Sequence, residues 1–292
     1  MSERAPLNAV PADFLADTLA YIEAHLFDAL SVAALADVAG LSPYHFSRMF
    51  TARFGDSAIA YVRARRMQAA ARRLTEGEPS LAELAFDCGF ESQEAFTRAF
   101  RREFGVPPGR YKREAAAQHP DKKGTTVSES APVQLTQMEG LTHRETFTIA
   151  GLRAMFDESN KSGIPALWPR LLACLPLAGQ VDGRTYGAIW TDHPGQSAAN
   201  YMAGVEVKGE APLPAGFERL DIAAQDYVVF RQMLDGPDLH PQMQRAAKEI
   251  WGERLPKLGR KLARSPDFEL YPEGFDPTKP GQYVDIYVPV MT

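Results

Sequence analysis

Hydrophobic positions in the first 115 residues recur at helical spacing, and the same pattern occurs twice. The segment 31–55 aligns with the segment 80–105 when one residue is inserted in the second. Residues four apart lie on one face of an α-helix, so an apolar residue at every fourth position predicts an amphipathic helix with a buried edge. In both copies these positions hold phenylalanine: Phe46, Phe50 and Phe54, then Phe96, Phe100 and Phe104. The repeat predicts two equivalent helical units.

Each copy also predicts a shorter helix and a tight turn before its phenylalanine-rich helix. Ser31 is placed as an N-cap, and Ser80 with Glu83 forms a capping-box pattern. Gly40 and Gly89 fall where a short turn between helices needs a backbone that tolerates positive φ. Helix, tight turn and helix make a helix-turn-helix unit. The first domain is therefore expected to be all-α, with two such units joined by a helix over 56–77.

The faces opposite the phenylalanines are the ones free to contact DNA. They carry Tyr44, Arg48 and Thr51 in the first unit and Glu94, Arg98 and Arg101 in the second. A helix of this kind fits the major groove, where an arginine can donate two hydrogen bonds to guanine. Any one arginine has the simpler interpretation of a solvated surface residue, but Arg48 and Arg98 stand at equivalent positions of the repeat.

The charge distribution supports a nucleic-acid partner for the first half only. The net charge of −5 arises beyond residue 124, because residues 1–124 carry equal numbers of basic and acidic side chains. Within residues 42–73 the one acid is Asp56. The arginines of that stretch, a candidate phosphate-binding face, are Arg48, Arg53, Arg63, Arg65, Arg66, Arg72 and Arg73.

The segments LADVAGLSPYHFSRMF at 35–50 and GFESQEAFTRAFRREFGVPPGRYKR at 89–113 resemble the DNA-binding domain of AraC/XylS-type transcription regulators. The resemblance implies double-stranded DNA as a partner and a DNA-binding domain over 8–114. It also departs from the family at Tyr44, Ser47 and Glu94, which leaves the operator sequence open. By position, the implied DNA contacts come from Tyr44, Ser47, Arg48, Gln93, Glu94, Thr97 and Arg98.

Residues 115–132 lack apolar periodicity and are predicted to be a flexible linker. Beyond them, over 133–292, strand-like runs alternate with helical ones in two similar cycles. Each cycle is expected to form a strand, a helix and two further strands. The second domain is thus predicted to be α+β, with two pseudo-symmetric halves.

Candidate chemistry in the second domain is limited to aromatic side chains and one carboxylate. Glu269 and Tyr271 share a face of the predicted strand 267–271. If that face lines an aromatic cleft, the carboxylate would attract a flat or cationic ligand. The simpler alternative is a solvated Glu269 beside core aromatics. No metal or cofactor site is expected, since the histidines form no cluster and both cysteines, Cys88 and Cys174, are interpreted as buried thiols.

The order of IPALW, YG-x-x-W, Y-x-AGVEV, AAQDYVVF, FELY and YVDIYVPV resembles the GyrI-like effector-binding domain. This resemblance implies a small lipophilic or cationic effector bound between the two halves, with an acid at Glu269 and aromatics at Trp168, Trp190 and Tyr201. Together with the aromatic pattern, it gives the expected effector-binding residues Trp168, Tyr186, Trp190, Tyr201, Glu269 and Tyr271.

These observations predict a cytoplasmic, ligand-responsive transcription regulator that is not an enzyme and has no membrane partner; RNA polymerase is a further candidate partner. One alternative is a catalytic second domain, because some GyrI-like proteins resemble hydrolases that use a Tyr and Glu pair, here Tyr201 and Glu269. Another is an architectural DNA-bending protein. That alternative leaves the aromatic second domain unexplained.

Overall fold

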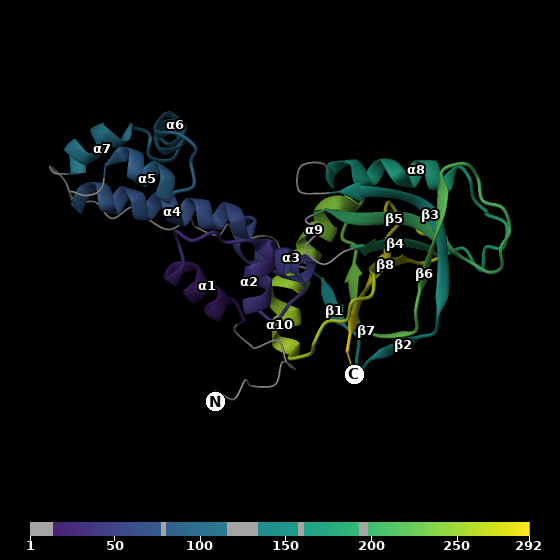
Figure 1. Cartoon of the computed structure of the whole chain (residues 1–292). Helices are drawn as coiled ribbons and strands as arrows, with labels where there is room; N and C mark the ends of the chain where they lie inside the picture. Colours follow the sequence, from purple (N-terminus) through teal and green to yellow (C-terminus); the bar gives the residue numbers. More distant parts are fainter. Residues whose placement is uncertain (1–13, 77–79, 116–133, 157–160, 193–197, 292) are drawn as a thin grey trace.

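The computed structural model describes residues 14–76, 80–115, 134–156, 161–192 and 198–291, which form a helical part and a sheet-based part (Figure 1). The helical part follows the predicted repeat. Its helices are α1 (Phe14–Ala24), α2 (Val32–Val38), α3 (Pro43–Phe54), α4 (Ala58–Glu76), α5 (Leu81–Asp87), α6 (Gln93–Phe104) and α7 (Pro108–Ala115).

The helix boundaries lie where the polar pattern predicted them. Ser31 caps α2, and the reciprocal capping box of Ser80 and Glu83 starts α5. The turns pass through Gly40 at φ 66° and Gly89 at φ 81°, a left-handed backbone that favours glycine. The pairs α2–α3 and α5–α6 are therefore helix-turn-helix units, with the phenylalanine edges of α3 and α6 buried.

The second domain is built on one antiparallel sheet. The strands are β1 (Leu135–Gln137), β2 (Thr142–Arg144), β3 (Phe147–Phe156), β4 (Thr185–Trp190), β5 (Ala199–Val207), β6 (Phe217–Ile222), β7 (Gln225–Met233), β8 (Asp267–Tyr271) and β9 (Tyr283–Val290). Their order is β1-β7-β9-β8-β4-β5-β3-β6, and β2 pairs with β7. The helical segments are η1 (Lys161–Ala166), α8 (Leu167–Leu172), α9 (Leu239–Glu249), the π-helix η2 (Ile250–Arg254) and α10 (Leu255–Leu258).

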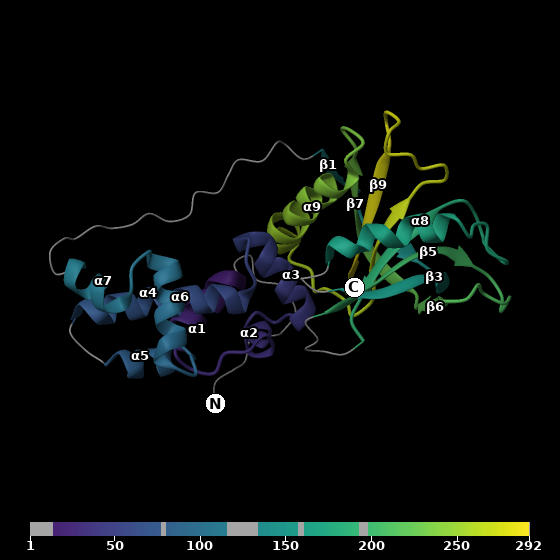
Figure 2. The ribbon, with the colours of Figure 1, turned by 90° about the horizontal axis from the view of Figure 1, so that it is seen from above.

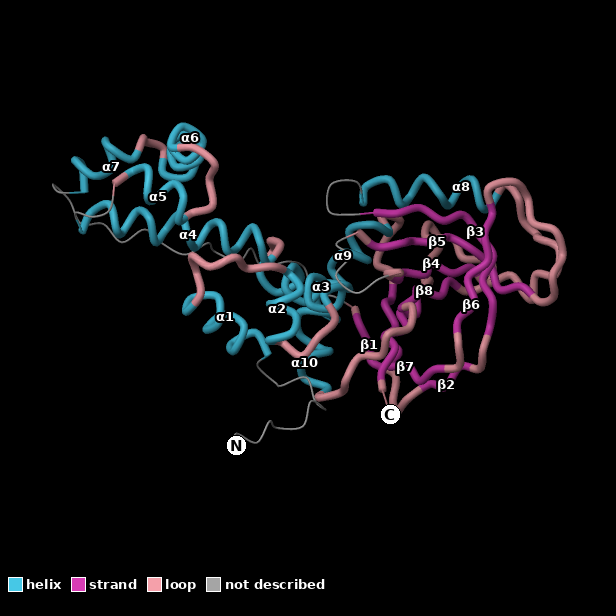
Figure 3. The backbone as a smooth tube through the Cα atoms, in the orientation of Figure 1, coloured by secondary structure: helices cyan, strands magenta, loops and turns pink. Residues whose placement is uncertain are grey.

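The predicted two-part α+β architecture is confirmed. One half contains β3, α8, β4 and β5, and the other contains β7, α9, β8 and β9; they meet where β4 pairs with β8. One face of the sheet carries α8 over β3 and β5 (Figure 3). On the same face, α9 and η2 pack against apolar side chains of β7 and β9. The other face holds a separate aromatic core around Tyr186, Tyr227 and Phe268.

One expectation from the sequence is corrected by the structure, and another concerns residues that the structure does not describe. Cys88 is buried as expected, but Cys174 is exposed, because it follows the short helix α8 at the surface instead of extending its buried edge. Nearly all of the predicted linker 115–132 lies outside the described residues.

The two domains share a hydrophobic core. A single cluster joins α3, through Phe46 and Met49, to Trp251 and Leu255 of the second domain. In both views α3 lies between α4 and the second domain, while α6 lies farther from the second domain than α3 does (Figure 1, Figure 2).

Candidate DNA-contact helices and effector cleft

Helix α6 presents its predicted DNA-contact residues to solvent. Gln93, Glu94 and Arg98 are exposed, and Thr97 is half-buried. Phe96 and Phe100 are fully buried on the opposite edge, which fixes the orientation of the helix. A hydrogen bond from its own backbone N–H lowers the pKa of Glu94, so this position carries a negative charge at neutral pH.

The equivalent face of α3 is already engaged. Arg48 donates hydrogen bonds to the Tyr44 hydroxyl (2.7 Å) and to Oδ2 of Asp267 (2.5 Å), and the Tyr44 hydroxyl donates to Oδ1 of Asp267 (3.2 Å). The guanidinium also lies 4.0 Å from the centre of the Trp251 ring. Of the predicted α3 contacts, Tyr44 and Arg48 thus bind the second domain in this structure.

The ion pair between α3 and the second domain is largely removed from water. The Asp267 side chain is 4% exposed and that of Arg48 is 24% exposed. Burial works against a charged guanidinium, but the carboxylate of Asp267 and the hydroxyl of Tyr44 together raise the pKa of Arg48 above its ordinary value. Arg48 is therefore charged, and separating it from Asp267 without another partner would leave a buried charge unpaired.

His45 completes this contact from the next position of α3. Its ring stacks on Trp251 with 5.6 Å between ring centres. Burial, and then the charge of Arg48, lower the pKa of His45 to about 3. The docked arrangement therefore requires a neutral imidazole.

Acid is expected to weaken this arrangement through His45. Between pH 6.5 and about 3 the unfolded chain takes up a proton that the folded chain does not, so stability falls as the pH falls. The variant His45→Phe keeps an aromatic ring against Trp251 but has no group that titrates. When the pH falls from 7.5 to 5.5, we expect its free energy of unfolding, measured with urea, to drop by roughly 1 kcal/mol less than that of the parent chain. Equal losses in both chains would show that His45 does not titrate on unfolding.

The arginine-rich stretch is only partly available to DNA. Arg65 pairs with Glu23, Arg66 donates to two backbone carbonyls, and Arg73 pairs with Asp87. The same stretch also contains exposed arginine side chains, those of Arg53, Arg63 and Arg72. The charge cluster thus also stabilises the first domain.

Four of the six predicted effector-binding residues lie together on the helical face of the sheet. Tyr271 donates to Oε2 of Glu269 at 2.7 Å, and Tyr201 donates to the same oxygen at 3.3 Å. Trp168 of α8 makes an edge contact with Tyr271, with ring centres 4.8 Å apart. These four residues form a cluster of contacting side chains, and we name the cluster of Trp168, Tyr201, Glu269 and Tyr271 the acidic cleft after the ligand cleft that the sequence led us to expect.

Glycine in β4 leaves room for the acidic cleft. Gly187 pairs with Glu269 across the strands, and a Cβ at position 187 would overlap the Tyr201 hydroxyl and the Glu269 carboxylate. Burial raises the pKa of Glu269, although the hydrogen bond from Tyr271 and the charge of Arg48 act in the opposite direction. Burial therefore disfavours the charged form of this carboxyl group, and the Arg48 charge and the Tyr271 hydrogen bond only partly offset that effect.

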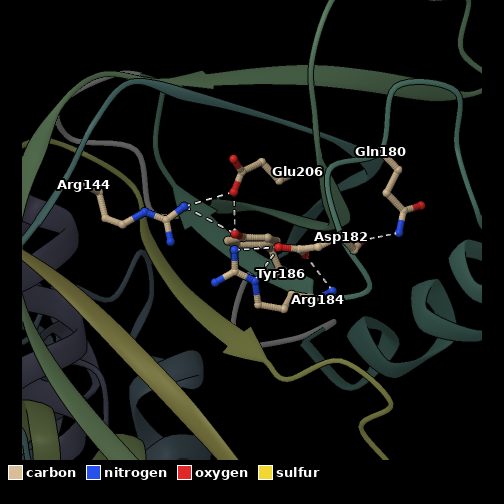
Figure 4. Close-up of polar contacts among 6 residues, drawn as sticks. All are labelled: Arg144, Gln180, Asp182, Arg184, Tyr186 and Glu206. Carbon is tan, nitrogen blue, oxygen red and sulfur yellow. Dashed lines mark hydrogen bonds and ion pairs between the residues drawn. The ribbon is translucent and has the colours of Figure 1, made fainter.

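The other two predicted residues lie on the opposite face. Tyr186 belongs to the separate aromatic core, where its hydroxyl donates to Glu206 (2.8 Å) and Arg144 contacts both (Figure 4). Trp190 packs against the same core and donates to Asp192. Side chains alternate between faces along a strand, so the even-numbered positions of β4 point away from Glu269.

Comparison with known families agrees with this division of the chain. Residues 35–114 match a helix-turn-helix domain, and residues 141–291, just over half of the chain, match the GyrI-like small molecule binding domain. The chain belongs to the AraC family of regulators and carries a GyrI-like domain.

The curated relatives match part of this AraC-family chain. It is 35% identical over 126 residues to the uncharacterized HTH-type transcriptional regulator YbfP of Bacillus subtilis, covering 40% of this chain and 43% of YbfP. It is 38% identical over 94 residues to the multiple antibiotic resistance protein MarA of Salmonella typhimurium, covering 32% and 74%. A crystal structure of the DNA-binding domain of AdpA, a global transcriptional factor, with a target DNA is 32% identical, covers 36% of this chain and 95% of that chain, and gives a TM-score of 0.33. The chain thus spans less than half the length of YbfP.

The described parts of this GyrI-like protein show no group of three or more histidine, cysteine or acidic side chains placed to hold a metal ion. Within the same parts, no helix has the length and apolar character needed to cross a bilayer.

Sequence reasoning did not assign Asp267, Trp251 or Gly187 to a functional site. Asp267 belongs to the same strand-like run as Glu269, at i−2, and strand alternation places it on the same face. Strand alternation therefore indicated that Asp267 and Glu269 share one face. The partner of Asp267 on α3, more than 200 residues away in sequence, was not visible in any local pattern.

Proposed function

We propose that this protein is a sequence-specific DNA-binding transcription regulator, and that its second domain binds a small lipophilic or cationic effector. The proposal is carried by the pairing of two helix-turn-helix units with an acidic cleft in one chain. Helix α6 offers Gln93, Thr97 and Arg98 to a major groove, and α3 is the equivalent helix of the first unit. Double-stranded DNA is the first partner and the effector the second.

The acidic cleft favours a flat or aromatic cation. Aromatic rings attract a cation through their electron-rich faces, and the poorly solvated Glu269 carboxylate adds a counter-charge. Binding such a ligand would supply the positive charge that Glu269 lacks. An anionic ligand would meet the same carboxylate with repulsion.

Arg98 provides the test of sequence-specific DNA binding. A duplex selected in vitro with the full chain serves as the specific site, and a scrambled duplex of equal length serves as the control. Replacing Arg98 with Ala is expected to weaken the selected complex by ~1–3 kcal/mol in fluorescence anisotropy, because an arginine bound to guanine loses two hydrogen bonds.

The scrambled duplex separates base recognition from backbone binding. Affinity for it should change much less than affinity for the selected site if Arg98 contacts a base. An equal loss on both duplexes would assign Arg98 to a phosphate, and no loss on either would remove α6 from the DNA interface.

The acidic cleft also carries a second candidate function. A carboxyl group with a raised pKa next to two tyrosine hydroxyls is suited to general-acid catalysis, so Glu269 and Tyr201 would form the catalytic pair of a hydrolase. Incubating the protein with reactive ring-containing compounds and following product by mass spectrometry tests this candidate. Turnover lost in Tyr201→Phe would support it, whereas binding without turnover favours the sensor.

We further propose that the regulator works in the cytoplasm, where its DNA would be found, without enzymatic activity, and that RNA polymerase is a candidate contact at the promoter.

A further inference from the structure

The guanidinium of Arg48 is bound as a ligand would be bound. It has a buried carboxylate on one side, Asp267 at 2.5 Å, and an indole ring on the other, Trp251 at 4.0 Å. The Tyr44 hydroxyl completes the set of contacts. A carboxylate and an aromatic face are the groups that bind organic cations in proteins. We call Asp267 and Trp251 the cation box.

The cation box adjoins the acidic cleft. Asp267 and Glu269 stand two residues apart on β8, so they share the face of the sheet between α8 and α9. The charges are close enough to interact, because Arg48 lowers the pKa of Glu269 while Asp267 raises it. Arg48 of α3 in the first domain thus supplies a positive charge that acts on the Glu269 carboxylate.

Docking in this arrangement brings the two domains into close contact. Ala52 of α3 lies against Gly252 of η2, where an added Cβ would come within 3.3 Å of the Ala52 backbone. Trp251 in the same segment is 2% exposed. The π-helix that carries both residues is a rare conformation that often marks functional positions. The face of α3 that holds Tyr44 and Arg48 cannot lie in a DNA groove while it lies here.

We propose that Arg48 is an internal occupant of the cation box: it holds α3 away from DNA until a cationic effector takes its place beside Asp267 and Trp251. This inference rests on the proposed function and extends the effector site from the acidic cleft to the adjoining cation box. One guanidinium cannot bind Asp267 and a DNA base at once. Effector binding and DNA binding therefore each increase the affinity for the other, because both favour the state in which Arg48 has left Asp267.

The expected coupling is reciprocal and measurable. By linkage, the factor by which an effector tightens DNA binding equals the factor by which DNA tightens effector binding. We expect a factor of about 10, within the range of roughly 5–150 found for coupled sites. Rhodamine 6G, a fluorescent aromatic cation, is the probe, and fluorescein, which has a similar ring system and negative charge, is its control.

The decisive experiment compares this factor in the parent chain with the factor in three variants. Asp267→Asn removes the charge of the cation box with little change of shape, and Arg48→Ala removes its occupant. Arg98→Ala is the matched control, because it deletes the equivalent arginine of the second unit. The proposal predicts a coupling factor near 1 in the first two variants and an unchanged factor in Arg98→Ala, although Arg98→Ala binds DNA more weakly.

A second measurement needs neither DNA nor effector. Hydrogen exchange of the free protein should become faster in α3 when Asp267 is replaced by Asn, and should stay unchanged in α6. Unchanged exchange in α3, or a coupling factor that survives both Asp267→Asn and Arg48→Ala, would overturn the proposal. A parent chain that binds DNA and rhodamine 6G independently would overturn it too, while leaving the proposed function in place. A parent chain that fails to bind DNA would refute the proposed function itself, whatever the exchange data show.

Discussion

Replacing Trp251 with Ala is expected to lower the free energy of unfolding by about 3–5 kcal/mol, the range for removing a large aromatic side chain from a core. Trp251 is among the largest fully buried side chains, and it joins the core cluster that spans both domains. Without the Trp251 side chain, the two domains should therefore unfold independently of each other. Differential scanning calorimetry should show one transition for the parent chain and two for Trp251→Ala.

Trp190→Phe is the control for this experiment, because it alters a half-buried tryptophan on the opposite face of the sheet. It should keep the single transition. If Trp251→Ala also keeps one transition with a small loss of stability, the shared core does not couple the domains.

Replacing Glu269 with Gln is expected to weaken rhodamine 6G binding at least tenfold, roughly 1.4 kcal/mol or more, since a poorly solvated charge pair loses one partner. Fluorescein should not lose affinity. The same change should raise the melting temperature at pH 7. Burial raises the pKa of Glu269 because it disfavours the ionised carboxylate. At a pH above this raised pKa the ionised Glu269 therefore destabilises the folded parent chain, whereas the neutral glutamine of the variant carries no such charge.

The pH dependence separates these two effects. Below pH 4.5 Glu269 is protonated in the folded and unfolded chain alike, so the two melting temperatures should converge as the pH falls toward that value. Equal affinity for rhodamine 6G in both chains would contradict the role of Glu269 in the acidic cleft, whatever the melting temperatures show.

Local patterns were enough to predict the first domain. Capping by Ser31 and Ser80, turns at Gly40 and Gly89, and the phenylalanine spacing all depend on residues within a few positions of one another. For the same reason, strand alternation correctly brought Glu269 and Tyr271 to one face. Features set by neighbours in sequence could be inferred from sequence.

Features set by long-range packing could not. Tyr186 and Trp190 have the right residue type for a ligand site, but the register of β4 turns them to the opposite face, and Gly187 is the residue beside Glu269. The sequence pattern treats residues 217–233 as the single strand that opens the second cycle, but this stretch forms two strands: β6 pairs with β3, and β7 pairs with β9. The contact of Arg48 with Asp267 depends on how the domains dock.

The most direct test of the account is DNA binding by the full chain to its selected duplex, at 50 and 200 mM salt, with and without saturating rhodamine 6G. A regulator of this kind should bind the selected duplex more tightly than the scrambled one, lose affinity at the higher salt as phosphate contacts weaken, and gain about tenfold when the cation is added. Specific binding that is identical with and without the cation would contradict an acidic cleft coupled to DNA binding.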